Sequence, residues 1–425
     1  MQFRQVQGMH DILPEQVGRW QRLEATFRRV VEAHAFSELR TPLVEPTALF
    51  VRSIGDATDI VEKEMFVLER EGESLALRPE GTASAARAFV EHAVHAREPV
   101  TRWYYLGAMF RAERPQRGRQ RQFHQAGCEV YGDPGPWVDA ELMELVLTFL
   151  REAGCPELEL HVSSLGGPET RARYRDALVA HLTPRAAALS ETSQRRLATN
   201  PLRVLDSKDP ADQAVVAGAP SLLDLLEGDD RAHWDELLAS LDSLGVPYVV
   251  DPALVRGLDY YTRTLFEVRS SAGGLGAQNT LVGGGRYDAM IGELGGPPVP
   301  AIGFALGLER LLLATEGAPA PTGRPRCFVA PLGARARREA LGLARELRAS
   351  GAVVEVDTRG GSLKSLLRRA DSLGSRLCLV LGDGELDRGV VQVKDLASHE
   401  RADVPRGALV EDVRRRLAGA PGSPE

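Results

Sequence analysis

The sequence predicts an α+β fold of more than one domain. The chain of 425 residues with 43% hydrophobic content is longer than one core usually requires. Residues 103–110 and 122–131 are aromatic and β-branched in part and flank the polar loop 112–121, which predicts an antiparallel hairpin. After residue 326, strand-like and helix-like segments alternate, which is typical of a separate α/β domain.

The first half of the chain predicts helices and strands that pack together. A helix is expected from about Pro14, because apolar residues recur there at three and four positions. Thr41–Pro46 contains two prolines, which favour extended chain, and we expect a strand entry or an interface edge there. A capped helix is expected over Asp139–Gly154 and a strand over 158–162.

The domain boundaries follow from changes in composition. The chain is mainly helical and rich in Arg, Asp and Glu from about Gly166 to Gly245, and it is rich in Pro, Gly and Ala just before the final α/β region. We predict a main domain from 1–168 and 247–316, an inserted helical domain at 169–246, a linker at 317–325, an α/β domain at 326–417 and a disordered tail at 418–425.

Composition argues against several classes of function. No apolar run approaches the roughly 18 residues of a membrane helix, and the first residues lack the apolar core of a signal peptide, so we expect a cytoplasmic protein without a membrane partner. The formal charge of −7 argues against nonspecific coating of nucleic acid, so an RNA partner would need a local basic surface. The cysteines form no CxxC pair and are interpreted as buried thiols: Cys128, Cys155, Cys327 and Cys378.

Arginines are dense in the loop between the two predicted hairpin strands. At this density they repel one another unless they are solvated, paired with carboxylates or bound to phosphate. From the loop alone, a solvated surface and a phosphate site are about equally expected. The loop arginines are Arg111, Arg114, Arg117, Arg119 and Arg121.

The strand after this loop separates an apolar face from a face with an aromatic and two polar side chains. Taken alone, such a strand is more often half-exposed than the floor of a pocket. The second face carries Phe123, Gln125, Gly127 and Glu129.

Further segments combine reactive side chains with turn signals. Thr82 precedes a helical pattern and is interpreted as an N-cap or a ligand contact, two roles that are compatible. By composition, Arg256–Tyr261 is a surface turn with a salt bridge. Residues 281–288 give a ligand room near the backbone, although no GxGxxG or Walker lysine pattern occurs. Arg310 lies among leucines and requires an anionic partner, which is either the adjacent glutamate, a distant carboxylate or a nucleotide phosphate.

Together these segments resemble class II aminoacyl-tRNA synthetases of the histidine type, in the family's order and over nearly the whole chain. Pro42 looks like the interface proline of motif 1, Phe110–Glu129 like motif 2 and Gly307–Arg310 like motif 3. Arg256–Tyr261 and Gly284–Asp288 look like the two histidine-specific motifs. The resemblance implies an antiparallel catalytic sheet with helices, an inserted helical domain and an α/β anticodon-binding domain.

The resemblance also implies a reaction in two steps. The histidine carboxylate attacks the α-phosphate of ATP to give histidyl-adenylate and pyrophosphate, and the 3′ end of tRNA(His) then takes the histidyl group. Because the first step brings two anions together, it requires fixed cations, and Arg111 and Arg256 are the matching catalytic positions. Arg119 and Arg310 would hold the outer phosphates, Phe123 would face adenine, and Mg²⁺ would accompany the pyrophosphate, with protein ligands that the sequence does not identify.

A histidine pocket is implied by the same resemblance. Neutral imidazole carries one donor and one acceptor, which Glu129 and Tyr261 would complement. Such polar recognition rejects apolar competitors by about 10⁴ or more, so no editing domain is expected. The substrate ammonium would meet Glu80, Thr82 and Gln125, Gly81 would admit its backbone, and Tyr260 and Tyr287 would line the pocket.

Two other functions are consistent with parts of the sequence. The stronger is a noncatalytic synthetase-like regulatory subunit of ATP phosphoribosyltransferase, a group that typically loses the motif arginines and lacks the C-terminal domain. The arginines and the region after Pro325 are both present here, which argues against it. A general RNA-binding protein agrees less well with the acidic net charge. The family therefore implies L-histidine, ATP and tRNA(His) as partners, and a homodimer.

Overall fold

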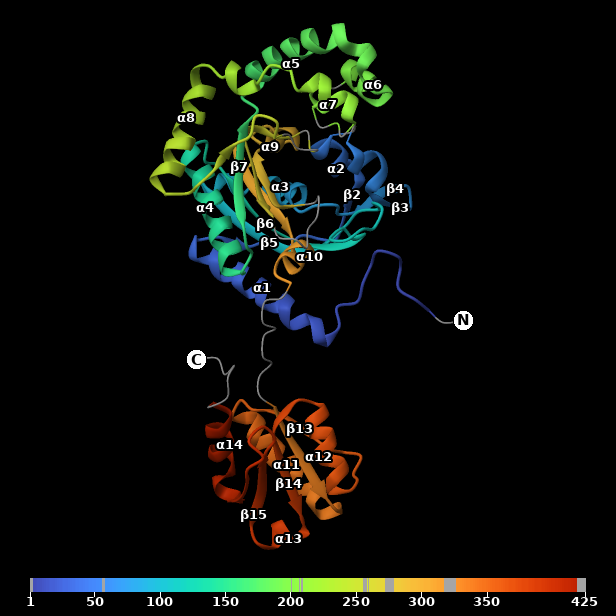
Figure 1. Cartoon of the computed structure of the whole chain (residues 1–425), viewed down its shortest axis with the longest axis vertical. Coiled ribbons are helices and arrows are strands. Elements are labelled where there is room, and N and C mark those ends of the chain that lie inside the picture. Colours follow the sequence, from blue (N-terminus) through green and yellow to red (C-terminus); the bar gives the residue numbers. More distant parts are fainter. Residues whose placement is uncertain are drawn as a thin grey trace. The chain divides into compact units, whose positions relative to one another are not determined.

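The computed structural model describes residues 3–55, 58–199, 201–205, 207, 209–254, 258, 260–271, 279–316 and 326–418. It divides into two compact units, Met1–Ala318 and Pro319–Glu425, which are described separately (Figure 1). The predictions for Arg256, for the linker 317–325 and for the tail from residue 419 onward lie outside the described residues.

Unit 1 is built on a large, mainly antiparallel sheet. The predicted hairpin is confirmed, because its two strands pair antiparallel from Thr101 opposite Tyr131 to Phe110 opposite Gln122. Both edge strands pair parallel to their neighbours. Within the described residues the sheet has eight strands, in the order β1 (Ser37–Glu38), β5 (Thr101–Phe110), β6 (Gln122–Tyr131), β11 (Ala301–Gly307), β10 (Thr280–Arg286), β9 (Thr262–Ser270), β7 (Leu158–Ser164) and β8 (Val249–Val250).

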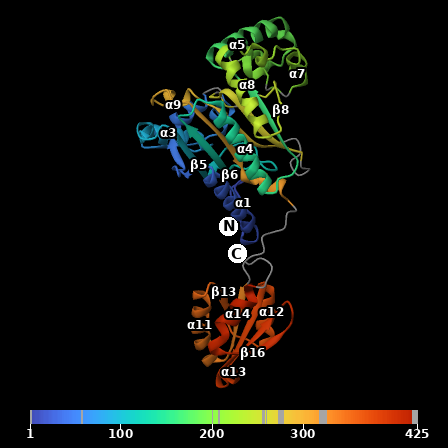
Figure 2. The same cartoon turned by 90° about the vertical axis from the view of Figure 1, so that its left-hand side faces the viewer.

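The two faces of this sheet have different environments. One face is covered by α1 (Pro14–Ala33) and α4 (Pro136–Glu152), and the other carries α3 (Thr82–Glu91), so that α3 and α4 lie on opposite sides of β5 and β6 (Figure 2). On the α3 face, Phe89 stacks on Tyr131 with ring centroids 4.5 Å apart. The core on the α4 face includes Phe27, Val31, Ala126, Cys128, Leu142, Val146, Phe149, Phe266 and Phe304.

A second, three-stranded sheet lies beside α3 and holds the segment that precedes it. Its order is β2 (Val44–Pro46), β4 (Glu73–Leu77) and β3 (Phe66–Arg70), and the sequence analysis did not predict the β3–β4 hairpin. After β4 the buried Arg78 donates from Nε to the carbonyl of Ala108 at 3.0 Å, and its backbone pairs with Leu43 and Phe110. The chain entering α3 is therefore fixed to both sheets.

Four α-helices and short 3₁₀ turns occupy the described chain between β7 and β8. One of them, α8, packs on α4, with Trp234, Leu237 and Leu241 in the shared core. Figure 1 shows these helices grouped at one end of unit 1. The α-helices are α5 (Pro168–Leu182), α6 (Glu191–Thr199), α7 (Pro210–Val216) and α8 (Gly228–Ser243).

A buried ion pair joins the sheet to α4. Arg286, at the end of β10, and Asp139, in the first turn of α4, are both fully buried, with Nη2 of the arginine 2.6 Å from Oδ1 of the aspartate. Asp139 also accepts from Thr264 at 2.6 Å and contacts His233 of α8 at 3.0 Å. The helix predicted over Asp139–Gly154 is confirmed, but α4 begins three residues earlier, at Pro136, and Asp139 is the carboxylate partner of a distant strand.

Replacing Arg286 with methionine is expected to lower the free energy of unfolding of unit 1 by about 3–5 kcal/mol, because it leaves a buried carboxylate without its cation. The exposed Arg231–Asp235 pair provides the control, and Arg231→Met should change stability by less than about 1 kcal/mol. Urea unfolding followed by tryptophan fluorescence measures both, since the four tryptophans, at positions 20, 103, 137 and 234, all lie in unit 1. Equal losses in the two variants would contradict this account.

Unit 2 is an α/β domain with a mixed sheet. The predicted alternation of strand and helix is confirmed, and β12, β13 and β14 are parallel, while β15 and β16 continue the sheet antiparallel. Helix α14 ends at Ala418, so the first residue of the predicted tail is helical. In the described residues the strand order is β13 (Val353–Val356), β12 (Arg326–Leu332), β14 (Ser375–Gly382), β15 (Val390–Asp395) and β16 (Arg401–Pro405), and the helices are α11 (Ala334–Ala349), α12 (Leu363–Ser372), α13 (Asp383–Asp387) and α14 (Leu409–Ala418).

Both faces of the unit 2 sheet are covered. Leu343 and Leu347 of α11 share one core with Val413 of α14, whereas Leu366 of α12 belongs to a second core. All four cysteines of the chain are buried, as predicted. Among the described residues, no helix is both long and apolar enough to cross a membrane.

Candidate active site

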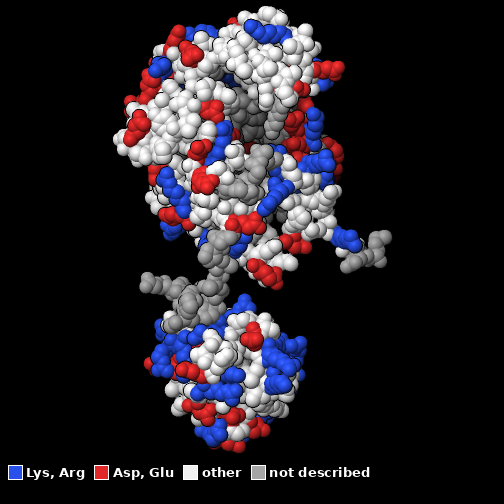
Figure 3. Space-filling view, viewed as in Figure 1, with Lys and Arg blue, Asp and Glu red and all other residues white. Residues whose placement is uncertain are grey.

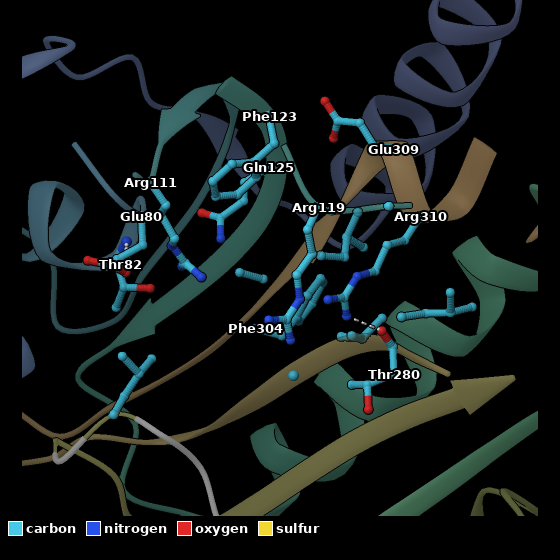
Figure 4. Close-up of a pocket in the computed structure, with 18 of the residues that line it drawn as sticks. Glu80, Thr82, Arg111, Arg119, Phe123, Gln125, Thr280, Phe304, Glu309 and Arg310 are labelled. Carbon is cyan, nitrogen blue, oxygen red and sulfur yellow. Dashed lines mark hydrogen bonds between the residues drawn. The ribbon is translucent and has the colours of Figure 1, made fainter. Parts of the chain in front are cut away.

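A polar pocket opens on the α3 face of the unit 1 sheet, where α3, β6, β10 and β11 meet (Figure 4). It brings together predicted residues that are up to 230 positions apart in the sequence. Of the predicted site residues, Glu80, Thr82, Arg111, Arg119, Phe123, Gln125, Tyr260, Tyr261, Tyr287 and Arg310 line it. Glu129 and Gly81 lie behind this lining, and Arg256 lies outside the described residues.

Arg111 follows the last residue of β5 and points into the pocket (Figure 4). Its Nε donates to the carbonyl of Pro79 at 2.9 Å, and its guanidinium lies over the ring of Phe123, 5.2 Å from the centroid. Burial lowers the pKa of Arg111, while Glu113 and Glu64 oppose that shift. Within the described chain Arg111 forms no ion pair, so a fixed, partly desolvated cation faces the cavity.

Two more arginines form the opposite end of the pocket (Figure 4). Arg119 contacts Glu113 at 3.2 Å, and Arg310 donates from Nη1 to the carbonyl of Thr280 at 2.8 Å. Glu309, considered above as a partner of Arg310, instead accepts from the backbone N–H of His124 at 3.0 Å. Three cations thus line one pocket, an arrangement suited to a polyphosphate.

Glu129 is a fully buried carboxylate that accepts hydrogen bonds from neutral hydroxyl groups. Thr82 donates to its Oε1 at 2.7 Å, Tyr105 to the same oxygen at 3.2 Å, and Tyr287 to Oε2 at 2.5 Å. Gly303 on β11 leaves the room for this group, since a Cβ there would lie 1.7 Å from Oε2. The strand is therefore not half-exposed, and the polar face of β6 supports the pocket.

Burial raises the pKa of Glu129 from 4.5 to about 8, although the hydrogen bonds from Tyr287 and Thr82 lower it. Between these two pH values the unfolded chain has released the proton that the folded chain retains, so stability falls as pH rises. The expected slope from this group approaches about 1.4 kcal/mol per pH unit. Between pH 5.5 and 7.5, urea unfolding followed by tryptophan fluorescence should show a smaller loss for Glu129→Gln than for the parent chain, and parallel losses would contradict the shift.

Glu80, and not Thr82, caps α3. Its carboxylate accepts the backbone N–H groups of Thr82 and Ala83, each at 2.8 Å, and burial raises its pKa. Thr82 is the first helical residue, so the prediction that it is an N-cap was wrong, while its hydroxyl is free to donate to Glu129. Among the described atoms, the buried Oε1 of Gln125 has no hydrogen-bond donor. The pocket thus contains a hydrogen-bond acceptor without a described donor, near the carboxyl groups of Glu80 and Glu129.

Aromatic rings form one wall of the pocket. The ring centroids of Tyr260 and Tyr261 are 4.6 Å apart, and Tyr260 meets Tyr287 edge to face at 5.6 Å. The carbonyl of Tyr261 accepts from Nη1 of Arg171 on α5 at 3.0 Å. The helices between β7 and β8 are therefore hydrogen-bonded to this wall.

Three further residues, which the sequence does not predict, belong to or support this site. Glu64 and Glu113 line the pocket beside Arg111, and burial raises the pKa of Glu64, with Glu113 adding to the shift. Glu113 could have been found from its position two residues after Arg111. Tyr105 contacts Glu129 from the neighbouring strand, and adjacent Tyr104 made the inward face of β5 ambiguous.

Comparisons with known proteins agree with this geometry. Residues 8–311 match the family model described as histidyl-tRNA synthetase, and residues 326–416 match an anticodon binding domain. The chain is 62% identical to a histidine–tRNA ligase of Sorangium cellulosum, with 99% of each chain covered, and 49% identical to one of Thermosynechococcus vestitus, with 95% of each covered.

Solved structures lead to the same grouping. The apo histidyl-tRNA synthetase of S. aureus matches with a TM-score of 0.83 and 34% identity over 97% of this chain and 99% of that one. A Bacillus halodurans protein titled ATP phosphoribosyltransferase regulatory subunit/histidyl-tRNA synthetase shares the fold, with a TM-score of 0.64 and 23% identity over 87% of this chain and 97% of that one.

The antiparallel sheet with its pocket and the appended α/β domain define a class II aminoacyl-tRNA synthetase fold, as predicted. Within that class, the chain belongs to the histidyl-tRNA synthetase family. The second match, to an anticodon binding domain, favours a synthetase over the regulatory subunit considered above.

Proposed function

We propose that the chain is a histidine–tRNA ligase that activates L-histidine with ATP and transfers it to tRNA(His). The observation that carries the proposal is one pocket lined by an arginine set suited to a polyphosphate, with the buried acceptor Glu129 behind its lining. High identity over the whole chain to relatives named histidine–tRNA ligase supports the same activity.

In this proposal Arg111 stabilises the charge that develops at the α-phosphate during adenylate formation, together with Arg256. Arg119 and Arg310 hold the outer phosphates, and Phe123 faces the adenine. The nucleotide enters as its Mg²⁺ complex, since Mg²⁺ is usually bound through substrate phosphates. Among the described residues Arg111 has no carboxylate partner, which supports its assignment, because such a cation attracts an anionic ligand.

The histidine side chain is proposed to lie between Glu129, which accepts one ring N–H, and Tyr261, which bonds the other nitrogen. Tyr260 and Tyr287 complete the wall. The ammonium group is proposed to meet Gln125, Thr82 and Glu80, with Gly81 giving it room. Oε1 of Gln125 has no donor among the described residues, which supports this placement, because an ammonium supplies one.

Unit 2 is proposed to bind the anticodon of tRNA(His), with 326–417 as its extent. Figure 3 shows Lys and Arg gathered over α12. Lys364 and Arg368 of this helix are exposed, as is Arg359, which precedes it in the sequence. Such a local basic surface attracts the phosphates of RNA although the net charge of the chain is negative. We further propose 1–168 with 247–316 as the catalytic domain, 169–246 as its insertion and the cytoplasm as the place of work.

A homodimer is also part of the proposal. Leu43 and Val44, next to the motif 1 proline, and Val67 and Leu68 of β3 are each 40–49% exposed on the small sheet. By the strand register, Val44 and Leu68 lie on one face of this sheet and Val67 on the other. Exposed apolar side chains on a sheet favour burial against a second copy.

Transfer to tRNA separates this proposal from a regulatory role on the same fold. Purified chain, ATP, labelled histidine and tRNA(His) should give acid-precipitable histidine that is released by mild base. A regulatory subunit would give none. Absence of charging by folded protein would overturn the proposal.

A further inference from the structure

Tyr105 is not among the described residues that line the pocket, yet its hydroxyl reaches the carboxylate on which histidine selection is proposed to depend. The side chain is 4% exposed and projects from β5 toward β6. Its hydroxyl donates to Oε1 of Glu129 at 3.2 Å and lies 3.5 Å from the hydroxyl of Thr82. A buried tyrosine hydroxyl usually requires a partner, and here the partner is a carboxylate.

Two glycines leave the space that this ring occupies. A Cβ added at Gly81 would lie 2.2 Å from Cε2 of Tyr105, and one added at Gly127 would lie 2.4 Å from its hydroxyl oxygen. Gly81 precedes α3 and Gly127 lies on β6, so two separate elements lack side chains where the ring passes. The position of the Tyr105 hydroxyl is therefore fixed by close packing on both sides.

The carboxylate that Tyr105 contacts is held by hydroxyl groups. Within the described chain Glu129 forms no ion pair, and its three donors are the hydroxyl groups of Thr82, Tyr105 and Tyr287. Each neutral donor orients this carboxyl group and lowers its pKa, against the rise that burial causes. Removing one donor therefore changes both the direction and the charge of the acceptor.

We propose that Tyr105 is a positioning residue for histidine selection: its hydroxyl, seated between Gly81 and Gly127, aims and stabilises the Glu129 carboxylate that receives the imidazole N–H. The inference rests on the proposed function and adds to it a residue that does not contact the substrate. It predicts that Tyr105 acts on the affinity for histidine and leaves the chemical step unchanged.

Tyr105→Phe keeps the ring and removes only the hydroxyl. We expect the KM for histidine in pyrophosphate exchange at pH 7 to rise roughly tenfold or more, the scale of one hydrogen bond to a charged group, with kcat within about twofold. The dissociation constant for histidine, measured by titration calorimetry, should rise by the same factor. Tyr104→Phe is the matched control, because Tyr104 is its neighbour on β5 and its hydroxyl donates to Glu32 of α1 on the opposite face.

A pH profile separates this role from packing alone. The titratable groups that face the Glu129 carboxyl are Glu80, Tyr105, Tyr131, Tyr260 and Tyr287, with Cys128 beside it on the strand. Loss of the Tyr105 donor disfavours the ionised form of Glu129. Because higher pH favours that form in both proteins, the ratio of the variant KM to the parent KM should decrease toward one from pH 7 to pH 8.5. A packing defect would give a ratio that does not depend on pH.

Three results would overturn the inference: a KM for Tyr105→Phe equal to that of the parent, a KM change equal to that of Tyr104→Phe, or a ratio that is constant with pH. Thermal unfolding of both variants checks that each is folded. If the parent chain shows no histidine-dependent exchange, the proposed function fails. If the parent exchanges and Tyr105→Phe matches it, only the role of Tyr105 fails.

Discussion

Replacing Arg111 with alanine is expected to lower kcat for histidine-dependent pyrophosphate exchange by about 10²–10³, with a smaller change in the KM for histidine. Removal of one preorganised donor at developing charge has an effect of this size in other enzymes. The structure gives Arg111 the required properties: Nε is held by the carbonyl of Pro79, the guanidinium lies over Phe123, and no carboxylate in the described chain pairs with it.

The control for Arg111 is Arg117→Ala, in the same loop. Arg117 is 65% exposed at its side chain and pairs with Glu316 on the surface, so its loss should leave exchange within about twofold. Arg111→Lys should remain strongly impaired, because a lysine cannot bond Pro79 and the phosphate with one planar group. Equal rates for Arg111→Ala and Arg117→Ala would remove Arg111 from the catalytic set.

The second large effect is expected at Glu129. Glu129→Gln places an amide among three hydroxyl donors and removes the acceptor for the imidazole N–H, so kcat/KM for histidine should fall by about 10³ or more. The loss should appear mainly in the KM for histidine, while the KM for ATP stays within about threefold, since the arginine set is unchanged.

A matched control is Glu159→Gln on β7 of the same sheet, whose carboxylate is 70% exposed and contacts His161. It should retain full exchange activity. Initial rates at varied histidine and varied ATP separate the two KM values. An unchanged KM for histidine in Glu129→Gln would contradict the role given to this carboxylate.

Much of the fold follows from local patterns. The helix from Pro14, the hairpin of β5 and β6 and the alternating elements of unit 2 were each predicted from apolar periodicity and turn residues, and the structure confirms them. Each of these elements buries one face, so apolar residues recur in its sequence with the period of a helix or a strand. The β3–β4 hairpin was missed, because its strands are mostly exposed and lack a clear alternation.

The errors occur where a side chain bonds to a distant element. Asp139 has the residue type of a helix cap, but its partner is Arg286, 147 residues later. Thr82 is also a residue type that commonly caps helices. The carboxylate of Glu80 caps α3 instead, and the hydroxyl of Thr82 donates to Glu129. No local pattern records such pairings, because they depend on how strands are ordered in the sheet.

The sequence predicts which residues belong to the candidate site, but it does not predict how they are arranged. Family resemblance named the residues, and composition alone left most of them as surface or capping groups. Their convergence depends on β6, β10 and β11 being neighbours. The distinction between pocket lining and support, as between Thr82 and Tyr105, could not be drawn from the sequence. Both hydroxyls reach the same oxygen of Glu129, and only the fold places Thr82 in the lining and Tyr105 behind it.

The central claim is that this pocket joins histidine to the α-phosphate of ATP. Its most direct test is pyrophosphate exchange without tRNA: purified chain, MgATP and labelled pyrophosphate, with each amino acid supplied in turn. The account predicts that label enters ATP when histidine is present and not with the other amino acids. Folded protein that shows no exchange with histidine, or equal exchange with an apolar amino acid, would contradict it.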